Sequence, residues 1–128
     1  MKSLKITLAA LGLLLVMGAP VLAHHGTAAF ETSKSVTVKG TMTQFDFTNP
    51  HCQLFFNVTD EKGETAKWQG ELTAPNKLAR AGWTKETLKP GDSVTVTGYM
   101  SKTGTHTIWI RNLIGPDGKA LPLSENQD

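Results

Sequence analysis

The sequence predicts an all-β fold, a small OB-fold-like barrel of five to six strands with one short helix between the third and fourth strands. Three observations predict it. Apolar and polar residues alternate over most of the chain after residue 35, turn residues separate the alternating runs, and one short helical pattern interrupts them. An immunoglobulin-like sandwich is the competing prediction, but it requires about seven strands and has no such helix.

The predicted first strand, residues 36–47, alternates in two phases. The first apolar set is Val36, Val38, Gly40 and Met42, and the second is Phe45 and Phe47. A bulge or coil near Gly40 would produce this change of phase in a strand that two sheets share. Asn49 and Pro50 then end the strand.

The predicted second and third strands, residues 52–58 and 66–72, alternate regularly and form a hairpin around a loop that contains Gly63. Cys52 opens the second strand on its apolar side. It is the only cysteine of the chain, so no disulfide can form within the chain. We expect its thiol to be buried.

A short helix is predicted between the third and fourth strands. Thr73 can cap it, Pro75 stands in its first turn, and Gly82 follows its end. We expect Leu78 on its inner side and Trp83 packed beneath it.

Two further strands complete the predicted barrel. Residues 94–98 place valines on one face, and Ile108 and Ile110 share a face in the next strand. A last hairpin at residues 116–118 leads to Leu121 and Leu123. Residues 36–123 are therefore the predicted barrel domain, and residues 124–128 a polar tail.

Residues 1–23 read as an export signal. Lys2 and Lys5 precede an apolar run, and Val21 and Ala23 occupy the small positions before a cut. Cleavage would make His24 the first residue of a periplasmic or secreted chain. Residues 24–35 would be an N-terminal segment before the barrel, and membrane contact would be confined to the signal before its removal.

Charge argues against a nucleic-acid partner. The chain has 13 basic and 11 acidic residues, and removal of Lys2 and Lys5 would leave equal numbers. Binding to nucleic acid requires a basic stripe that displaces phosphate counterions. We therefore expect an envelope protein or a small ligand as partner.

Cleavage would also give His24 a free α-amine with a pKa of about 8. The amine and imidazole of one residue can chelate one metal ion, and a third nitrogen from His25, His51 or His106 would make a set that suits copper(II). The alternative is a mobile tail that binds adventitious metal weakly. The known zinc-binding spacings are absent from the sequence.

Two loops and an aromatic face offer a second kind of site. His51 and His106 lie in the loops that flank the usual binding face of an OB-fold. His106 also shares its parity with Ile108 and Ile110, so it could instead cap the barrel. Phe55 and Trp109 point away from the apolar sets and, with Asn49, could form a face for a ligand or partner. The alternative, which we favour, is that the N-terminal segment, which contains Phe30, folds back and covers these aromatics.

The carboxylates give no clear catalytic pair. Glu71 ends the third strand and could form a salt bridge with Arg80 on the following helix. We could identify no set of serine, histidine and aspartate in the sequence, and no loop of the kind that cradles phosphate.

The chain resembles a family of small exported bacterial proteins known only as a domain of unknown function. The resemblance rests on His24-His25-Gly26 followed by an Ala-Phe pair, on Thr48-Asn49-Pro50-His51, and on the motif LKPGD at residues 88–92. It covers nearly the whole chain after residue 23. It implies importance for His24, His25 and His51, but not for His106.

The sequence therefore predicts an exported binding protein that holds copper through the mature N-terminal histidine. One alternative is a metal-free interaction module that uses the barrel face and the loop after the first strand. The other is a small copper-dependent oxidase or monooxygenase. Cleavage after residue 23 would leave 105 of the 128 residues, and this length provides little surface for a substrate beside a metal, which argues against the enzyme.

Overall fold

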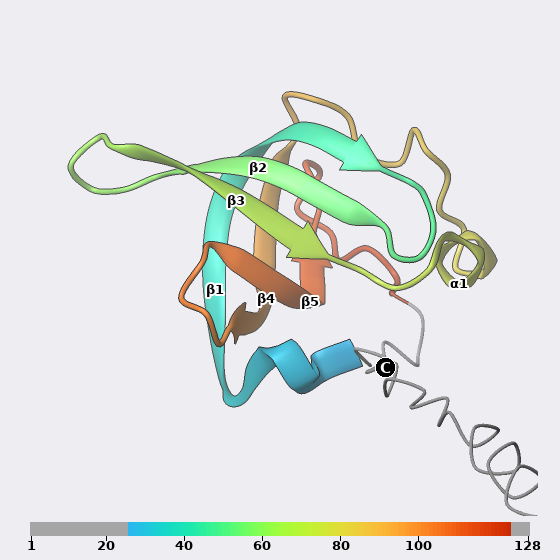
Figure 1. Ribbon diagram of the computed structural model, residues 1–128. Coiled ribbons are helices and arrows are strands. Elements are labelled where there is room, and N and C mark those ends of the chain that lie inside the picture. Colours follow the sequence, from blue (N-terminus) through green and yellow to red (C-terminus); the bar gives the residue numbers. More distant parts are fainter. Residues whose placement is uncertain (1–25, 124–128) are drawn as a thin grey trace, which may run out of the picture.

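The computed structural model describes residues 26–123 (Figure 1). The elements, in chain order, are the 3-10 helix η1 (Gly26–Ala29), β1 (Phe30–Asp46), β2 (Gln53–Thr59), β3 (Thr65–Glu71), α1 (Pro75–Arg80), β4 (Ser93–Ser101) and β5 (Thr107–Ile114). The predicted export signal lies outside the described residues, as do His24, His25 and the predicted tail. None of the helices in residues 26–123 has the length and apolar character needed to span a membrane.

The five strands close into a barrel in the order β1, β2, β3, β5, β4, with β4 returning to β1. Only the β3–β5 pair is parallel among these strands, and the other four pairs are antiparallel. A five-stranded barrel in this order, with a helix between β3 and β4, is the arrangement of an OB-fold. The predicted fold class is confirmed.

The long strand β1 pairs with two neighbouring strands, one after the other along its length. It pairs with β4 up to Thr41 and with β2 from Thr41 onward. The pairing with β2 shifts register between Met42 and Gln44, so a bulge lies where the sequence changes phase. A Cβ on Gly40 would lie 2.5 Å from the carbonyl oxygen of Asn57, which explains why glycine occupies this crossing.

The barrel interior is filled by apolar side chains from β1, β2, β4 and β5, from residues next to β2 and β3, and from the segment around α1. The buried core cluster comprises Met42, Cys52, Leu54, Phe56, Leu72, Leu78, Trp83, Leu88, Val94, Val96, Ile108, Ile110 and Leu113. These residues follow the alternation that predicted the strands. Cys52 is fully buried and unbridged, as expected.

The helix differs from its prediction at the start. Ala74 is its first flanking residue and no side chain caps it. The predicted cap Thr73 is wrong, because this residue is buried and lies one position too early. The end agrees with the sequence, since Gly82 adopts a φ of 95° after the last turn. Trp83 is buried and donates from Nε1 to the Pro122 carbonyl at 2.7 Å.

The first strand begins earlier than expected. Residues 30–35, assigned by the sequence to an N-terminal segment, belong to β1, where Phe30 pairs with Ser101 and Ser35 with Tyr99. The barrel therefore extends to Phe30, and η1 runs directly into it (Figure 1).

Candidate functional site

One cluster of polar and aromatic side chains forms where the loop after β1 meets the end of β3. His51 lies in this loop, and Glu71 is the last residue of β3. Two backbone hydrogen bonds hold the loop there: the Cys52 amide donates to the Thr73 carbonyl at 3.0 Å, and the Leu72 amide donates to the Cys52 carbonyl at 2.9 Å. These two bonds hold the backbone that follows His51 against the backbone that follows Glu71, so the two residues lie next to each other.

The imidazole of His51 and the carboxylate of Glu71 form a close pair. Nδ1 of His51 lies 2.5 Å from Oε1 of Glu71. The side chains are 33% and 22% exposed, respectively, so solvent still reaches the pair. Glu71 therefore pairs with His51, and the predicted salt bridge to Arg80 is wrong.

This pairing determines which nitrogen of the His51 ring carries the proton. An ionised carboxylate only accepts hydrogen bonds, so Nδ1 carries a proton and donates it to Glu71. In the neutral imidazole the other nitrogen, Nε2, then keeps its lone pair. The Nε2 lone pair of His51 is thus available to bind a ligand.

Trp109 forms the floor of the cluster. The His51 ring meets its indole edge-on, with 5.8 Å between centroids and an interplanar angle of 73°. Phe30 packs on the same indole at 5.8 Å. Trp109 is only 1% exposed, so it is not part of an accessible partner face. The N-terminal segment covers it through Phe30, which was the alternative interpretation of the sequence.

One polar atom of this cluster lacks a partner. The Nε1 of Trp109 is buried, and within residues 26–123 no acceptor meets it. A buried donor left without an acceptor costs about 1–3 kcal/mol. Within residues 26–123, this donor therefore remains available to an additional acceptor.

The His51 cluster, meaning His51, Glu71, Trp109 and Phe30, lies near the start of the described chain. Because Phe30 and His51 both pack on Trp109, their ring centroids lie within twice 5.8 Å of each other. The 3-10 helix η1, with a rise of about 2 Å per residue, directly precedes Phe30. The described chain therefore begins within a few residues of the cluster.

The described residues alone do not form a metal site. Between residues 26 and 123 there is no group of three or more histidine, cysteine, aspartate or glutamate side chains arranged to hold a metal ion. His51 and Glu71 are two such side chains, and further ligands would have to come from outside this range.

The remaining predicted site residues are not members of the His51 cluster. Asn49 is exposed in the loop after β1, and Phe55 lies on β2 in a groove with Lys67 of β3. His106 does not cap the barrel. It is exposed and stacks on Trp68 at 4.8 Å with an interplanar angle of 5°.

Sequence reasoning missed two of these contacts. The parity of His106 pointed to the core, whereas the chain before β5 turns it onto the ring of Trp68. The role of Glu71 depends on the loop after β1 folding against the end of β3, which alternation along either strand does not encode. A histidine directly after Asn-Pro and a glutamate at a strand end were the only available signals.

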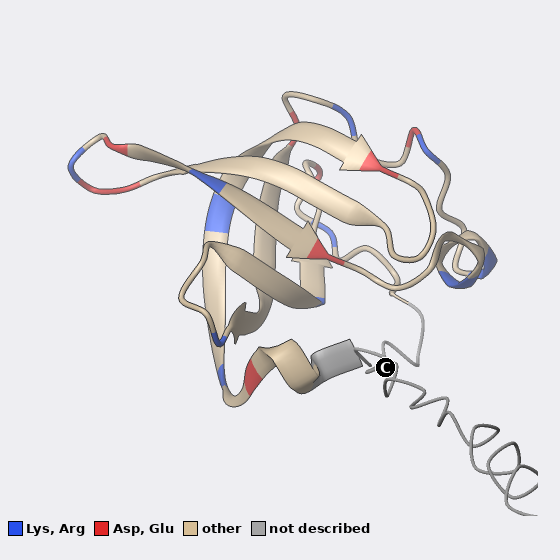
Figure 2. Ribbon diagram, viewed as in Figure 1, with Lys and Arg blue, Asp and Glu red and all other residues tan. Residues whose placement is uncertain are grey.

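Acidic and basic residues are interspersed over the strands and loops visible in Figure 2, including the tip of the β2–β3 hairpin. The hairpin tip alone carries Asp60, Glu61, Lys62 and Glu64. Three of these four residues are acidic.

Residues 11–109 match the model of a family described as a family of unknown function (DUF6152). No curated protein matches the chain.

Among solved structures, the chain is similar to TiaS in a complex with a tRNA and ATP, at 24% identity and a TM-score of 0.44, over 66% of this chain and 18% of that one. It is also similar to a ZRD-deleted mutant of TiaS in complex with agmatine, at 21% identity and a TM-score of 0.40, over 77% of this chain and 24% of that one. A third similar structure is the N-terminal domain of PriB from Thermoanaerobacter tencongensis, at 15% identity and a TM-score of 0.45, over 70% of this chain and 98% of that one. The chain therefore spans about a fifth of the TiaS chains.

Proposed function

This chain belongs to the DUF6152 family, whose function is unknown, and we propose that it is an exported copper(II)-binding protein. In this proposal the amine and imidazole of His24 hold the ion after signal removal, with His51 or His25 as a further ligand. The protein would act as a carrier, buffer or sensor of copper, rather than as a catalyst.

The observation that carries the proposal is the hydrogen bond from His51 to Glu71. Metal-binding histidines commonly donate their second ring nitrogen to a carboxylate, which fixes the ring and raises the basicity of the ligating nitrogen. His51 has this arrangement, and its Nε2 remains for an ion. The partial exposure of the ring leaves a path for the ion from solvent.

The geometry of the N-terminus supports the same site. Phe30 fixes the start of β1 on Trp109, beside His51. Residues before Phe30 are thereby tethered close to the imidazole, which raises the effective concentration of His24 at His51. Two nitrogens of His24 and one of His51 would form the nitrogen-rich set that copper(II) favours among the divalent first-row ions.

The unpartnered Nε1 of Trp109 adds further support. An indole N–H donates only, so it suits an acceptor such as a carbonyl of the incoming N-terminal segment or a water or anion beside the ion. Completion of the site would therefore also satisfy this buried donor.

The proposal is tested by comparing a chain that starts at His24 with one that keeps Ala23 ahead of it. In the longer chain the His24 nitrogen is an amide and no longer an amine. We expect copper(II) affinity, measured by competition with a chelator of known strength, to fall at least tenfold, about 1.4 kcal/mol. The copper(II) electron paramagnetic resonance spectrum should also change. Equal affinity of the two chains would overturn the N-terminal chelate.

The role of His51 requires a separate comparison. His51→Ala should weaken copper binding in the chain that starts at His24, whereas His106→Ala should not, because His106 lies on Trp68 away from the His51 cluster. The two variants remove the same side chain from two loops, so they are matched. If both bind copper as the parent does, His51 is not a ligand and His25 becomes the candidate for the further nitrogen.

A further inference from the structure

A groove crosses β3 on the part of the barrel formed by β1, β2 and β3. It consists of two adjoining cavities of about 480 and 340 Å³, which share Phe55, Lys67 and Trp68 in their walls. We propose that this groove, the β3 groove, binds a neutral oligosaccharide. The proposal does not depend on copper, since His51 lines neither cavity.

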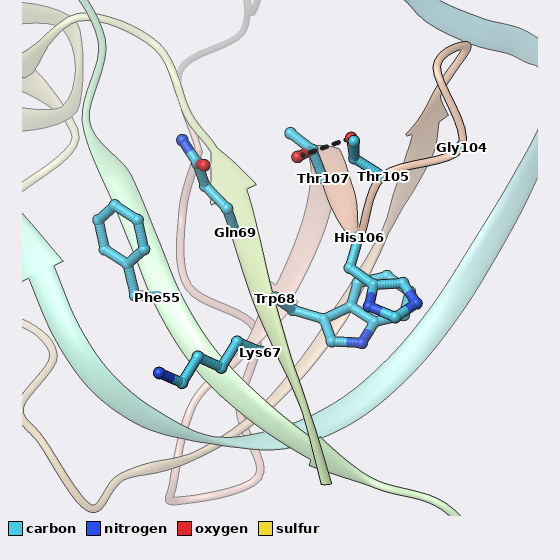
Figure 3. Close-up of a pocket in the computed structure, with 8 residues that line it drawn as sticks. All are labelled: Phe55, Lys67, Trp68, Gln69, Gly104, Thr105, His106 and Thr107. Atoms are coloured by element: carbon cyan, nitrogen blue, oxygen red, sulfur yellow. Dashed lines mark hydrogen bonds between the residues drawn. The ribbon is translucent and has the colours of Figure 1, made fainter.

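The aromatic residues supply flat apolar surfaces. Figure 3 shows Phe55 on one side of β3 and the stacked rings of Trp68 and His106 on the other. Phe55 and Trp68 are half-buried and His106 is exposed, so ring surface remains in contact with solvent. Aromatic faces carry negative potential and attract the weakly positive C–H groups that a pyranose ring presents on its apolar face.

The polar lining suits hydroxyl groups. Gln69, Thr105 and Thr107 line the larger cavity, and Gln44 and Asn57 line the smaller one. Amides and hydroxyls both donate and accept hydrogen bonds, as sugar hydroxyls do.

Part of this lining is already held in position. Gln69 donates from Nε2 to Oε1 of Gln53 at 2.6 Å, and the Thr105 hydroxyl donates to that of Thr107 at 3.2 Å. Side chains fixed before binding lose less conformational freedom when a ligand arrives.

Charge selects among ligand classes. Lys67 is the one permanently charged side chain among the residues that line the two cavities. Single-stranded nucleic acid also stacks on aromatic rings, but it requires a basic groove that follows its phosphates. A lining of aromatics, amides and hydroxyls with one cation favours an uncharged ligand.

The shape of the groove favours a chain over a single small molecule. The two cavities lie side by side across β2 and β3, the smaller toward β1 and the larger toward the loop between β4 and β5, with Phe55, Lys67 and Trp68 common to both. Each volume is within the range of about 300–1,000 Å³ typical of ligand sites. Successive sugar units could therefore occupy the two cavities in turn. In OB-folds, this strand pair and the loop between β4 and β5 form the usual ligand face.

The test titrates the chain starting at His24 with cellotetraose, chitotetraose and maltotetraose, followed by calorimetry. A decathymidylate serves as the nucleic-acid comparison. We expect at least one tetraose to bind with a Kd below about 1 mM, and more tightly than the decathymidylate.

Three variants locate the site. His106→Ala and Phe55→Ala should each weaken binding of that tetraose at least tenfold, whereas Arg111→Ala, at an exposed position of β5 outside the groove, should leave it unchanged. His106 is exposed on a loop, so its removal leaves the core intact even if Phe55→Ala reduces stability. Thermal unfolding of each variant provides that control.

Three outcomes would overturn the proposal. The first is the absence of binding by all three tetraoses at concentrations about ten times the expected limit, and the second is tetraose binding that neither His106→Ala nor Phe55→Ala affects. Tighter binding of the decathymidylate would also reject the neutral oligosaccharide and assign the β3 groove to nucleic acid. Copper affinity has no bearing on these results, so failure here leaves the copper proposal standing.

Discussion

Glu71 shows how much the chemistry of one side chain depends on its neighbour. Without a partner, His51 would be a loop histidine with either tautomer available. The carboxylate fixes which nitrogen carries the proton and the direction in which the other faces. Glu71, at the end of β3, therefore fixes both the tautomer and the orientation of the His51 ring.

We predict that Glu71→Ala lowers copper(II) affinity about 10- to 100-fold, the usual effect of losing a carboxylate that supports a ligating histidine. Glu71→Gln should have a smaller effect, because the amide oxygen still accepts from Nδ1 but carries no charge. Chelator competition measures both variants. Glu86→Ala, at an exposed position after α1, is the matched control and should bind as the parent does.

Cys52 leads to a second prediction at this scale. Burial raises the pKa of its thiol, and a hydrogen bond involving the Thr48 backbone only partly opposes this. We predict no reaction with a thiol-specific alkylating reagent at neutral pH in the folded protein, and complete reaction in denaturant. Mass spectrometry measures the modified fraction. Rapid modification of the folded chain would show that the barrel opens locally at this position.

The raised pKa of Cys52 also sets a pH dependence. Folding favours the neutral thiol, so the associated stability is fully present below the unfolded pKa and is lost as pH rises through the higher folded pKa. The parent should therefore lose stability relative to Cys52→Ala above about pH 9. Denaturant unfolding at pH 7 and pH 10 measures the difference.

At the scale of the elements, β4 and β5 approach each other closely at Gly98. Their register shifts between Thr97 and Gly98, and a Cβ on Gly98 would lie only 1.9 Å from the Trp109 carbonyl oxygen. This distance is too short for any side chain, and the obstacle is backbone that cannot rotate away. The irregularity between these strands therefore requires glycine.

We predict that Gly98→Ala destabilises the protein by about 3 kcal/mol or more, because β4 or β5 must shift to accommodate the methyl group. Gly115→Ala is the control. A Cβ there would meet its nearest neighbour at an ordinary 3.6 Å, so we expect a change within about 1 kcal/mol. Urea unfolding of the two variants measures both values, and equal destabilisation would contradict this account of the clash.

The sequence predicted those elements whose burial is one-sided. Val94 and Val96, and Leu54 and Phe56, alternate with polar residues because only one face of each strand meets the core. The start of β1 was missed for the same reason. Residues 31–35 are exposed on both faces, so pairing with β4 left no pattern in their composition.

Contacts between elements were harder to predict than the elements. The expectation that the N-terminal segment covers Trp109 was correct, since Phe30 packs on its indole. The physical reason is that an outward-facing aromatic side chain on a barrel costs free energy unless another group shields it. The particular contacts of His51, Glu71 and His106 depend on where loops cross, and a single sequence does not encode this. The sequence thus singled out His51 but not the carboxylate that orients it.

Considered as a whole molecule, the barrel depends on its last strand. β5 pairs with both β3 and β4, so it closes the ring. Without it, two strands would keep open edges and the core would lose Ile108, Ile110 and Leu113. The barrel therefore should not exist as a stable four-stranded form.

We predict that a chain ending at residue 106 is unfolded or aggregated, whereas a chain ending at residue 123, which keeps every strand and the Pro122 carbonyl bound by Trp83, folds. Circular dichroism and size-exclusion chromatography distinguish the two states. A folded, monomeric chain ending at residue 106 would show that ring closure is dispensable.

The closure of the ring by β5 also determines what happens while the chain is being made. Synthesis proceeds from the N-terminus, so β1 emerges first, yet its partner β4 begins only at Ser93 and the ring closes only with residues 107–114. Until then the growing polypeptide has strand edges with unpaired backbone groups, and such species aggregate readily. The polypeptide must therefore be kept from neighbouring nascent chains until β5 has been translated.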